Sequence, residues 1–496
     1  MWLLLILLPV ILAAGCGPAG RQTENNGDGN GPIRLHPQNP HYFLYKGKTL
    51  AIVSSAEHYG AVINLDFDYR RYLETLAAEG MNYTRLFAGT YFEVPGESFR
   101  IENNTLAPRK DRVITPWKKV TGPGGNEKYD LSQWNDAYFD RLKDFVRLAQ
   151  EKDIIVEITL FSSVYADRMW NICPQNPANN INLDPGLSRR EVHTLQNGKL
   201  FGYQAALVRK LVHELNDLDN FFFEIQNEPW SDRGVPVYNL LNQEDLENNS
   251  WTLKVDFADA ASLAWQDSLA AIIATEEEQL GRRHLIAQNY ANFGAPVPRV
   301  SDHISVINFH YDWPEAVRWN YHYDRVVGFD ESGFAGSGDK VYRRQAWKFM
   351  LSGGGLFNNL DYSFFVGHED GTGVNNAPGG GSKTLRRQLK TLRDFLESFP
   401  LEKMHPNCTA VVRSPGLIPY LLSDGDEAFA LYLRAVGTDS SLLQLRTGKG
   451  TYRVMILNTL TGVYDEPQTL TAVDGLLTLD VEIADGELAL KIIREE

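Results

Sequence analysis

The sequence is short of cysteine and lacks several motifs that would fix its chemistry. Three cysteines in 496 residues, Cys16, Cys173 and Cys408, are too few for a disulfide framework, and the sequence leaves open whether the last two pair. No cysteine–histidine spacing matches a zinc site, and neither H-E-x-x-H nor G-x-S-x-G occurs. No G-x-G-x-x-G opens a helix, which argues against dinucleotide binding. We therefore expect no metal and no organic cofactor.

Positive charge is also scarce. The chain has 48 Lys and Arg against 63 Asp and Glu, a formal net charge of −15. Such a balance disfavours nucleic acid and anionic membrane surfaces as partners, and it fits a neutral substrate. The remaining composition, 43% hydrophobic and 22% charged, is typical of a globular protein and does not indicate an oligomeric state.

Long apolar runs are confined to the N-terminus. Residues 1–15 are apolar but too short for a transmembrane helix, as in a secretory leader. Residues 12–16, Leu-Ala-Ala-Gly-Cys, resemble the lipobox of bacterial lipoproteins, although no Lys or Arg precedes them. The resemblance implies lipidation of Cys16; a simple cleaved signal is the alternative. The Gly/Asn-rich residues 16–32 predict a flexible tether. We expect an exported lipoprotein, periplasmic or cell-surface, that contacts a membrane through its lipid alone.

Strand-like and helix-like segments alternate from about residue 49 to 399. The eight strand-like runs, each short, apolar and rich in β-branched or aromatic residues, fall at 49–54, 82–87, 154–160, 221–228, 284–288, 304–309, 326–331 and 354–360. Eight β/α units in this order predict an α/β fold, a closed (β/α)8 TIM barrel over 33–404. An open doubly wound sheet is the alternative.

Apolar residues at helical spacing predict the helices between these strands. They fall at 68–79, 132–149, 203–217, 257–280, 340–351 and 382–398. Ser132 is expected to cap the second of them. Two long segments, about 88–131 and 161–200, have no periodicity, and loops of that size are uncommon unless they have a function.

The pattern changes after about residue 405. Short β-rich runs occur at 410–412, 428–433, 451–457, 476–481 and 488–493, and Gly-containing turns separate them. This spacing predicts a small antiparallel β-sandwich over 405–496.

Two carboxylates stand at the ends of predicted strands. Glu228, in Gln-Asn-Glu-Pro-Trp, follows the fourth strand, and Glu331 ends the seventh. Side chains that end barrel strands meet at the C-terminal face, where such barrels place their catalytic groups. Paired carboxylates there indicate glycoside chemistry, in which one protonates the leaving oxygen and the other attacks or activates water. The alternative is a pair of unrelated loop or helix-capping carboxylates, and Asp330 is a rival to Glu331.

These motifs resemble those of clan A retaining glycoside hydrolases, the group that includes family 5 cellulases. Over about residues 40–400 the chain matches their pattern of Asn-Glu after strand four (Asn227, Glu228), Glu after strand seven (Glu331), Arg after strand two (Arg85), and His and Tyr after strand six (His310, Tyr311). His and Tyr are adjacent here, and Asp361-Tyr362 stands where family 5 usually has Trp. The layout, and Gly450-Thr451-Tyr452, are also similar to bacterial apiosidase-like proteins.

The resemblance implies a role for each residue. Glu228 is the acid/base, so its site must disfavour the anion; Glu331 is the nucleophile and must stay ionised. Arg85 is expected to keep Glu331 ionised, Tyr311 to orient it, and Asn227 to bind the sugar 2-hydroxyl. A structural ion pair is the alternative for Arg85, and a packed rim histidine for His310.

Other residues on the predicted active face are candidates for sugar binding. Glu57 and His58 follow strand one, with a satisfied rim pair as the alternative. Aromatic side chains, which stack on sugar faces, crowd the same loops: Tyr91, Phe92, Trp117, Tyr165, Trp170, Trp230, Trp313 and Tyr362. From this group and its neighbours we select Trp170, Trp313, Asp361 and Tyr362. Glu157 and Glu224 lie inside strands and are expected to be barrel carboxylates.

Three functions remain in competition. The first is a retaining glycosidase acting on an oligo- or polysaccharide or other glycoside, with exo-action suggested by the long loops. The second is a non-catalytic glycan-binding surface lipoprotein, which would not need both carboxylates. The third is another barrel hydrolase that uses Ser or a metal, for which no motif is present.

Overall fold

The computed structural model describes residues 31–122, 124–247 and 250–495. The predicted leader, Cys16 and the tether up to residue 30 lie outside them. Within the described ranges, no helix has both the length and the apolarity needed to cross a membrane.

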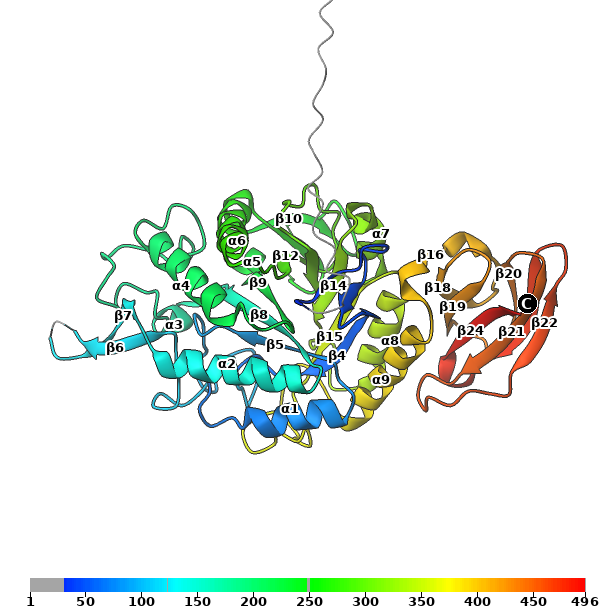
Figure 1. Cartoon of the computed structure of the whole chain (residues 1–496), viewed down its shortest axis with the longest axis horizontal. Helices are drawn as coiled ribbons and strands as arrows, with labels where there is room; N and C mark the ends of the chain where they lie inside the picture. Colours follow the sequence, from blue (N-terminus) through cyan, green and yellow to red (C-terminus); the bar gives the residue numbers. More distant parts are fainter. Residues whose placement is uncertain (1–30, 123, 248–249, 496) are drawn as a thin grey trace, which may run out of the picture.

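A barrel of parallel strands forms the larger part of the chain (Figure 1). Within the described residues its eight strands are β4 (Ile52–Ala56), β5 (Tyr83–Phe87), β8 (Ile155–Ser162), β9 (Phe221–Asn227), β12 (Ile286–Asn292), β13 (Val306–His310), β14 (Val326–Glu331) and β15 (Leu356–Leu360). The ladder runs β4-β15-β14-β13-β12-β9-β8-β5, and every residue of these strands is buried. Burial on both faces explains why they appear in the sequence as continuous apolar runs. The predicted barrel is confirmed.

Side chains rather than a ladder bridge the seam between β4 and β5. Asn82 Oδ1 accepts from the Val53 backbone N–H at 3.1 Å, and its Nδ2 donates to the Ala51 carbonyl at 3.0 Å. Ser54 Oγ donates to the Tyr83 carbonyl at 2.6 Å. The barrel is thus nearly closed, with its edge polar groups satisfied.

Helices pack around the barrel between successive strands (Figure 1). The longer ones are α1 (Tyr69–Ala78), α2 (Asp136–Glu151), α4 (Leu200–Leu215), α6 (Ala260–Leu280), α8 (Asp339–Met350) and α9 (Lys383–Glu397). Ser382 caps α9 by accepting from the Leu385 N–H at 3.0 Å. The predicted cap at Ser132 is wrong, because α2 begins at Asp136 and Ser132 lies in a strand.

Shorter elements precede the barrel and lie in the segments that follow its strands. At the N-terminus, β1 (Arg34–Leu35), β2 (Phe43–Tyr45) and β3 (Lys48–Leu50) form a small antiparallel sheet. The segments after the barrel strands contain the hairpin β6 (Trp117–Thr121) with β7 (Glu127–Trp134), the hairpin β10 (Gly234–Asn239) with β11 (Lys254–Ala258), α3 (Asp167–Trp170), α5 (Pro229–Arg233), α7 (Pro314–Asn320) and the 3-10 turn η1 (Tyr321–Tyr323). The segment predicted to be irregular over 88–131 therefore includes a hairpin.

Antiparallel sheets form a β-domain at the C-terminal end of the chain (Figure 1). One has the order β16-β18-β19-β24-β21-β22, with β16 (His405–Pro406), β18 (Leu417–Ser423), β19 (Ala428–Ala435), β21 (Gly450–Leu457), β22 (Gln468–Ala472) and β24 (Glu487–Glu495). The other has the order β17-β20-β23, with β17 (Val411–Arg413), β20 (Ser440–Arg446) and β23 (Leu476–Glu482). The 3-10 turns η2 (Leu401–Lys403), η3 (Cys408–Ala410) and η4 (Ala484–Gly486) connect these parts. Leu431, Leu443 and Leu479 belong to the core of this domain.

A buried ion pair ties the β-domain to the barrel helices. Glu487, at the start of β24, accepts from the Arg343 guanidinium of α8 and from the Tyr432 hydroxyl of β19. The Tyr432 ring stacks on Trp347 of α8 with centroids 5.4 Å apart. Cys173 is buried, Cys408 is exposed, and both are free thiols.

Candidate active site

Glu228 stands just beyond β9 in a left-handed backbone conformation. Its φ and ψ are 48° and 51°, and Pro229 begins α5 immediately after it. The Ser163 hydroxyl donates to the Glu228 carbonyl at 2.6 Å and fixes this turn. Tyr59 and Tyr311 also have positive φ, 62° and 56°. Non-glycine residues in this region store strain, and such strain clusters at functional sites.

Glu331, the last residue of β14, faces Glu228. Carboxylate oxygens of the two residues and a ring nitrogen of His310 lie within 4.8 Å of one another. The Tyr311 hydroxyl lies 2.9 Å from Oε1 of both glutamates. The Tyr59 hydroxyl donates to Glu331 Oε2 at 3.2 Å. Two strands far apart in sequence thus bring both predicted carboxylates to one place.

Arg85, from β5, is fully buried beneath this pair. Its Nη1 donates to Glu331 Oε2 at 3.1 Å, and its Nη2 donates to Asn227 Oδ1 at 2.9 Å. The same guanidinium binds Glu224 and lies 3.3 Å from Asp330 Oδ2. Arg85 therefore holds Glu331 and Asn227 in fixed positions, and Asn227 also donates to the Tyr165 hydroxyl at 2.7 Å.

His310, the last residue of β13, lies between acidic groups. Its Nδ1 is 2.9 Å from Glu228 Oε1 and 3.4 Å from Glu331 Oε2, and its Nε2 is 3.6 Å from Asp330 Oδ2. Burial acts to lower the pKa of His310, but the charges of Glu331 and Asp330 and its hydrogen bonds outweigh it and raise the pKa well above the ordinary value. The imidazolium is thus the counter-charge for these carboxylates.

The two facing glutamates have pKa values shifted in opposite directions. Burial raises the pKa of Glu331 to about 7; His310 opposes this shift and Glu228 adds to it. Burial acts in the same direction on Glu228, but the hydrogen bond and charge of His310, with Tyr165 and Tyr311, hold its pKa below the ordinary value. In the substrate-free protein His310 lies closer to Glu228 than to Glu331 and stabilises the Glu228 anion, and the acid/base assignment of Glu228 stays a prediction. The pair as a unit retains one proton to near pH 7.

A second group of carboxylates lies deeper in the barrel. Glu157, Glu224 and Asp330 bring oxygens within 4.8 Å of one another, all fully buried. Asn308 Nδ2 donates to Glu157 Oε1 at 2.8 Å and to Glu224 Oε1 at 3.2 Å. A Cβ on Gly328 would lie 2.2 Å from Asn308 Oδ1, so only glycine leaves room for this side chain. Glu157 and Glu224 are barrel carboxylates, as predicted, and Arg85 is the cation among them.

A small pocket, called the catalytic pocket below for its candidate role, opens over Glu228 and Glu331. Its cavity volume is about 40 Å³, and its walls include the two glutamates, Asn227, His58, Tyr59, Tyr91, Glu93, Phe99, Tyr165, Tyr311 and Phe334. Phe99 packs edge-to-face on Tyr165 and Phe334, with centroids 5.0 and 6.3 Å away. Aromatic rings with a few convergent polar groups are typical of a small-molecule site.

The predicted sugar-binding residues divide into two groups. His58 lines the pocket, and both of its buried ring nitrogens lack a hydrogen-bond partner within the described chain. Glu57, in contrast, accepts from Thr105 Oγ1 at 2.7 Å and from the Ala61 N–H at 3.1 Å, so it fastens a loop. Asp361 accepts from Ser55 at 2.6 Å and from Arg386 Nη1 at 2.7 Å, away from the pocket.

The remaining aromatic candidates do not line the pocket over Glu228 and Glu331. Trp313 stacks on Phe293 with centroids 5.6 Å apart, and Trp170 ends α3. Tyr362 is buried against the His58 ring at 5.6 Å. Within the described residues, none of these three is among the walls of the catalytic pocket.

Several pocket residues could not be selected from the sequence. Tyr59 follows Glu57 and His58, and the position after β4 that selected those two residues could have identified it as well. Glu93, Phe99 and Phe334 come from segments without periodicity, where the sequence carries no signal for direction. Glu93 accepts from Asn104 Nδ2 at 2.5 Å and from the Tyr91 hydroxyl at 3.0 Å, and burial raises its pKa to about 7.

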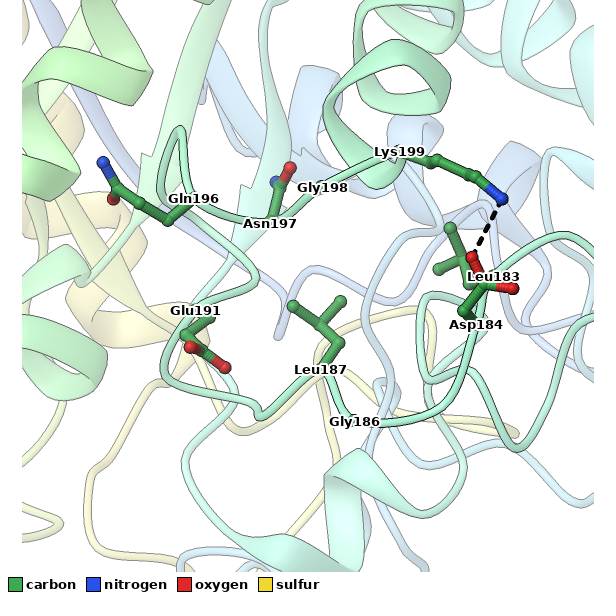
Figure 2. Close-up of a pocket in the computed structure, with 9 residues that line it drawn as sticks. All are labelled: Leu183, Asp184, Gly186, Leu187, Glu191, Gln196, Asn197, Gly198 and Lys199. Carbon is green, nitrogen blue, oxygen red and sulfur yellow. Dashed lines mark hydrogen bonds and ion pairs between the residues drawn. The ribbon is translucent and has the colours of Figure 1, made fainter.

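A separate hollow of about 250 Å³ lies in the segment between β8 and α4 (Figure 2). Its walls are Leu183, Asp184, Gly186, Leu187, Glu191 and residues 196–199, and Lys199 Nζ donates to Asp184 Oδ2 at 2.8 Å. Both partners of this ion pair are mostly exposed. The hollow contains none of the predicted catalytic residues, so the candidate site stays at the barrel mouth.

No model of a known protein family matches the sequence. No curated protein matches it either.

Solved structures do resemble the fold. A putative glycoside hydrolase from Bacteroides vulgatus ATCC 8482 aligns with a TM-score of 0.64 at 13% identity, over 94% of this chain and 83% of that one. A glycoside hydrolase family 5 structure from the same organism aligns at 0.58 and 10%, over 94% and 93% of the two chains. Another glycoside hydrolase aligns at 0.58 and 12%, over 94% and 97%. The chain therefore has the fold of these glycoside hydrolases, and at such identities the likeness concerns the fold alone.

Proposed function

We propose that this protein is a retaining glycoside hydrolase that cleaves O-glycosidic bonds by double displacement, with Glu228 as acid/base and Glu331 as nucleophile. One observation carries the proposal. Two glutamates at the ends of β9 and β14 present oxygens within 4.8 Å of each other. Carboxyl groups about 5–5.5 Å apart are typical of retaining enzymes, whereas inverting enzymes need about 6.5–9.5 Å to admit water.

Each step uses groups already in contact. Glu331 attacks the anomeric carbon as the bond to the leaving oxygen breaks and Glu228 gives that oxygen a proton. Glu228 then takes a proton from water, which attacks the same carbon and releases Glu331. Attack needs an ionised Glu331 and a protonated Glu228, so the proton of the pair must be on Glu228 when the substrate is bound. The Tyr311 hydroxyl, 2.9 Å from both, links the two positions.

Proton NMR of the first product tests this mechanism. An aryl-glycoside panel of different sugars identifies a substrate, and the anomer released before mutarotation is then recorded. Retention is expected. An inverted first product would overturn double displacement while leaving the barrel unaffected.

The same panel separates the enzyme from a glycan-binding protein. The substrate we propose is an oligo- or polysaccharide or another glycoside, with aromatic rings supplying the contact to its sugar faces. A non-catalytic binder would bind such sugars without releasing aglycone from any member of the panel.

We also propose that the protein is exported and anchored by lipid at Cys16. The leader over 1–15 and the tether over 16–32 would precede a barrel over 33–404 and a sandwich over 405–496. The support is the small-residue run before Cys16 and the polar segment after it. Cys16→Ser is expected to leave the protein unlipidated and release it from membranes in fractionation. Unchanged membrane association would place the anchor elsewhere.

A further inference from the structure

A larger cavity adjoins the catalytic pocket. Its volume is about 620 Å³, and it lies between the segment after β5, the hairpin β6–β7 and the chain that follows α3. Glu93 forms part of the wall of both cavities, so the two are neighbours across one side chain. A saccharide bound over Glu228 and Glu331 would therefore have this space on the far side of the buried Glu93 side chain.

The lining is basic in a chain of net charge −15. Lys110, Lys119 and Lys128 border the cavity, and the acidic residues there are Glu93 and Glu127. Lys119 Nζ lies 3.6 Å from Glu127, and Glu93 is held by Tyr91 and Asn104. Among the described residues, the side chains of Lys110 and Lys128 have no hydrogen-bond or ion-pair partner.

The hairpin β6–β7 contributes two lysines to the wall of the cavity. Lys119 and its cross-strand partner Tyr129 lie on one face of the hairpin, and both border the cavity. Lys128, which is paired with Val120, also borders the cavity, whereas Lys118 does not. The Lys119 ammonium also lies 5.6 Å from the Tyr129 ring centre.

The cavity also has the surfaces that a sugar ring needs. Phe92, Val113 and Ile172 supply apolar contact, and Asn126 and Asn179 supply amide groups for hydroxyls. Ammonium groups bind carboxylates and sulfates through charge-assisted hydrogen bonds, which are roughly twice as strong as neutral ones. Lysines without carboxylate partners, beside such surfaces, are matched to an anionic saccharide.

We propose that this cavity binds an acidic group on a saccharide unit next to the bond that is cleaved. The acidic group is the carboxylate of a uronic acid or a sulfate ester. The inference rests on the proposed glycosidase function and names the class of its substrate, an acidic glycan. Lys110 and Lys128 carry the charge recognition, and Glu93 separates this subsite from the catalytic pair.

Calorimetric titration of the full chain tests the proposal. The probes are short oligosaccharides of galacturonic or glucuronic acid, their carboxyl-reduced neutral counterparts, and neutral counterparts carrying O-sulfate. We expect acidic probes to bind more tightly than neutral ones, by about tenfold for each well-placed ion pair, and to weaken as salt rises. Comparison of the carboxylate-bearing probes with the sulfate-bearing probes shows which acidic group is preferred.

Variants locate the binding. Lys110→Gln with Lys128→Gln is expected to weaken the acidic probes at least tenfold and to leave neutral probes unchanged. Lys118→Gln, on the same hairpin but not bordering the cavity, is the matched control. Lys110→Arg with Lys128→Arg retains the charges and is expected to retain binding. Unfolding midpoints confirm that each variant is folded.

The results separate this inference from the proposed function. Equal binding of acidic and neutral probes overturns the inference, as does an equal loss in the Gln pair and in Lys118→Gln. Failure of every acidic probe to bind also overturns it. Hydrolysis of neutral aryl-glycosides, measured on the same samples, reports on the catalytic pair independently of these outcomes.

Discussion

At the scale of single residues, Glu331 offers the sharpest test of the catalytic assignment. We expect Glu331→Gln to lower turnover to less than about a hundredth of the wild-type rate, because an amide cannot form the glycosyl ester. Aryl-glycoside hydrolysis measures this. Glu315→Gln, at an exposed position of α7, is the control and should retain full activity. A Glu331→Gln variant that remains active would transfer the role to another group, with Asp330 the nearest rival.

The shared proton of the glutamate pair predicts the alkaline limb of the pH profile. Because the pKa of Glu331 is raised to about 7, the pair keeps its proton below that pH and loses it above. We expect kcat/KM to fall as pH rises through about 7, since the doubly ionised pair has no acid to give.

The charge of His310 is expected to influence the pH at which kcat/KM falls on the alkaline limb. His310→Asn removes the positive charge that opposes the raised pKa of Glu331, so the limb should move to higher pH. His213→Asn, at an exposed position of α4, provides the comparison and should leave the profile unchanged. A limb that stays in place, or moves down, contradicts the assignment of the imidazolium as counter-charge.

The sequence predicted catalytic residues at strand ends and failed for residues whose direction depends on loops. Glu228, Glu331 and His310 each end or follow a buried strand, so the barrel geometry alone brings them together. Glu57 and Asp361 occupy similar positions, but they accept hydrogen bonds from Thr105 and Arg386, which are distant in sequence. Both carboxylates therefore have structural roles. Whether a carboxylate at a strand end faces the pocket or has a structural role depends on long-range partners, and no local sequence pattern indicates them.

At the scale of elements, the hairpin β10–β11 places an aromatic side chain beside the catalytic pocket. Trp251, in the connection between these strands, is 46% exposed, so its ring is available to a ligand. It packs edge-on against Tyr311 and Phe334, with centroids 5.5 and 5.7 Å away. With Phe293 and Gly333 it lines a cavity of about 210 Å³ that shares Tyr311 and Phe334 with the pocket.

Trp251 is therefore expected to bind the part of the substrate beyond the cleaved bond. We predict that Trp251→Ala raises KM about tenfold for substrates with a sugar as leaving group, and changes kcat little, because stacking contributes about 1 kcal/mol. Trp319→Ala, on α7, removes another exposed indole and should have no such effect. Steady-state kinetics with a disaccharide and an aryl-glycoside measure the changes in KM and kcat separately. A loss of kcat alone would assign Trp251 a structural role.

Helices and strands could be predicted from the sequence where burial gave their apolar residues a recognisable pattern. The eight strands are buried on both faces and gave continuous apolar runs, and α9 gave a clear helical stripe with its Ser382 cap. The first strands of the hairpins, β6 and β10, are exposed on much of their length, so no apolar pattern marked them. Within the β-domain, β18, β20 and β22 were missed for the same reason, since their burial is irregular.

At the scale of the whole molecule, the groups to which we assign catalysis and recognition lie at the ends of the barrel strands or in the segments that follow them. The catalytic pocket adjoins the basic cavity through Glu93 and the aromatic cavity through Tyr311 and Phe334. A chain of three adjoining cavities can hold more than one sugar unit. The long segments after β5 and β8, from which exo-action was expected, border the basic cavity, and exo-action itself stays a prediction.

The β-domain is joined to the barrel through Glu487, and this joint yields the last prediction. The carboxylate is buried among Arg343, Arg344 and Tyr432, so Glu487→Gln leaves the Arg343 guanidinium without its counter-charge. Breaking a buried pair in this way costs roughly 3–5 kcal/mol, and urea unfolding should show a loss of that size. Glu482→Gln, exposed on β23, should change the unfolding free energy by less than about 0.5 kcal/mol. Because Glu487 does not line the catalytic pocket, kcat/KM at low temperature should persist. Equal stability of the two variants would mean that apolar packing, with Trp347 stacked on Tyr432, holds the joint without the ion pair.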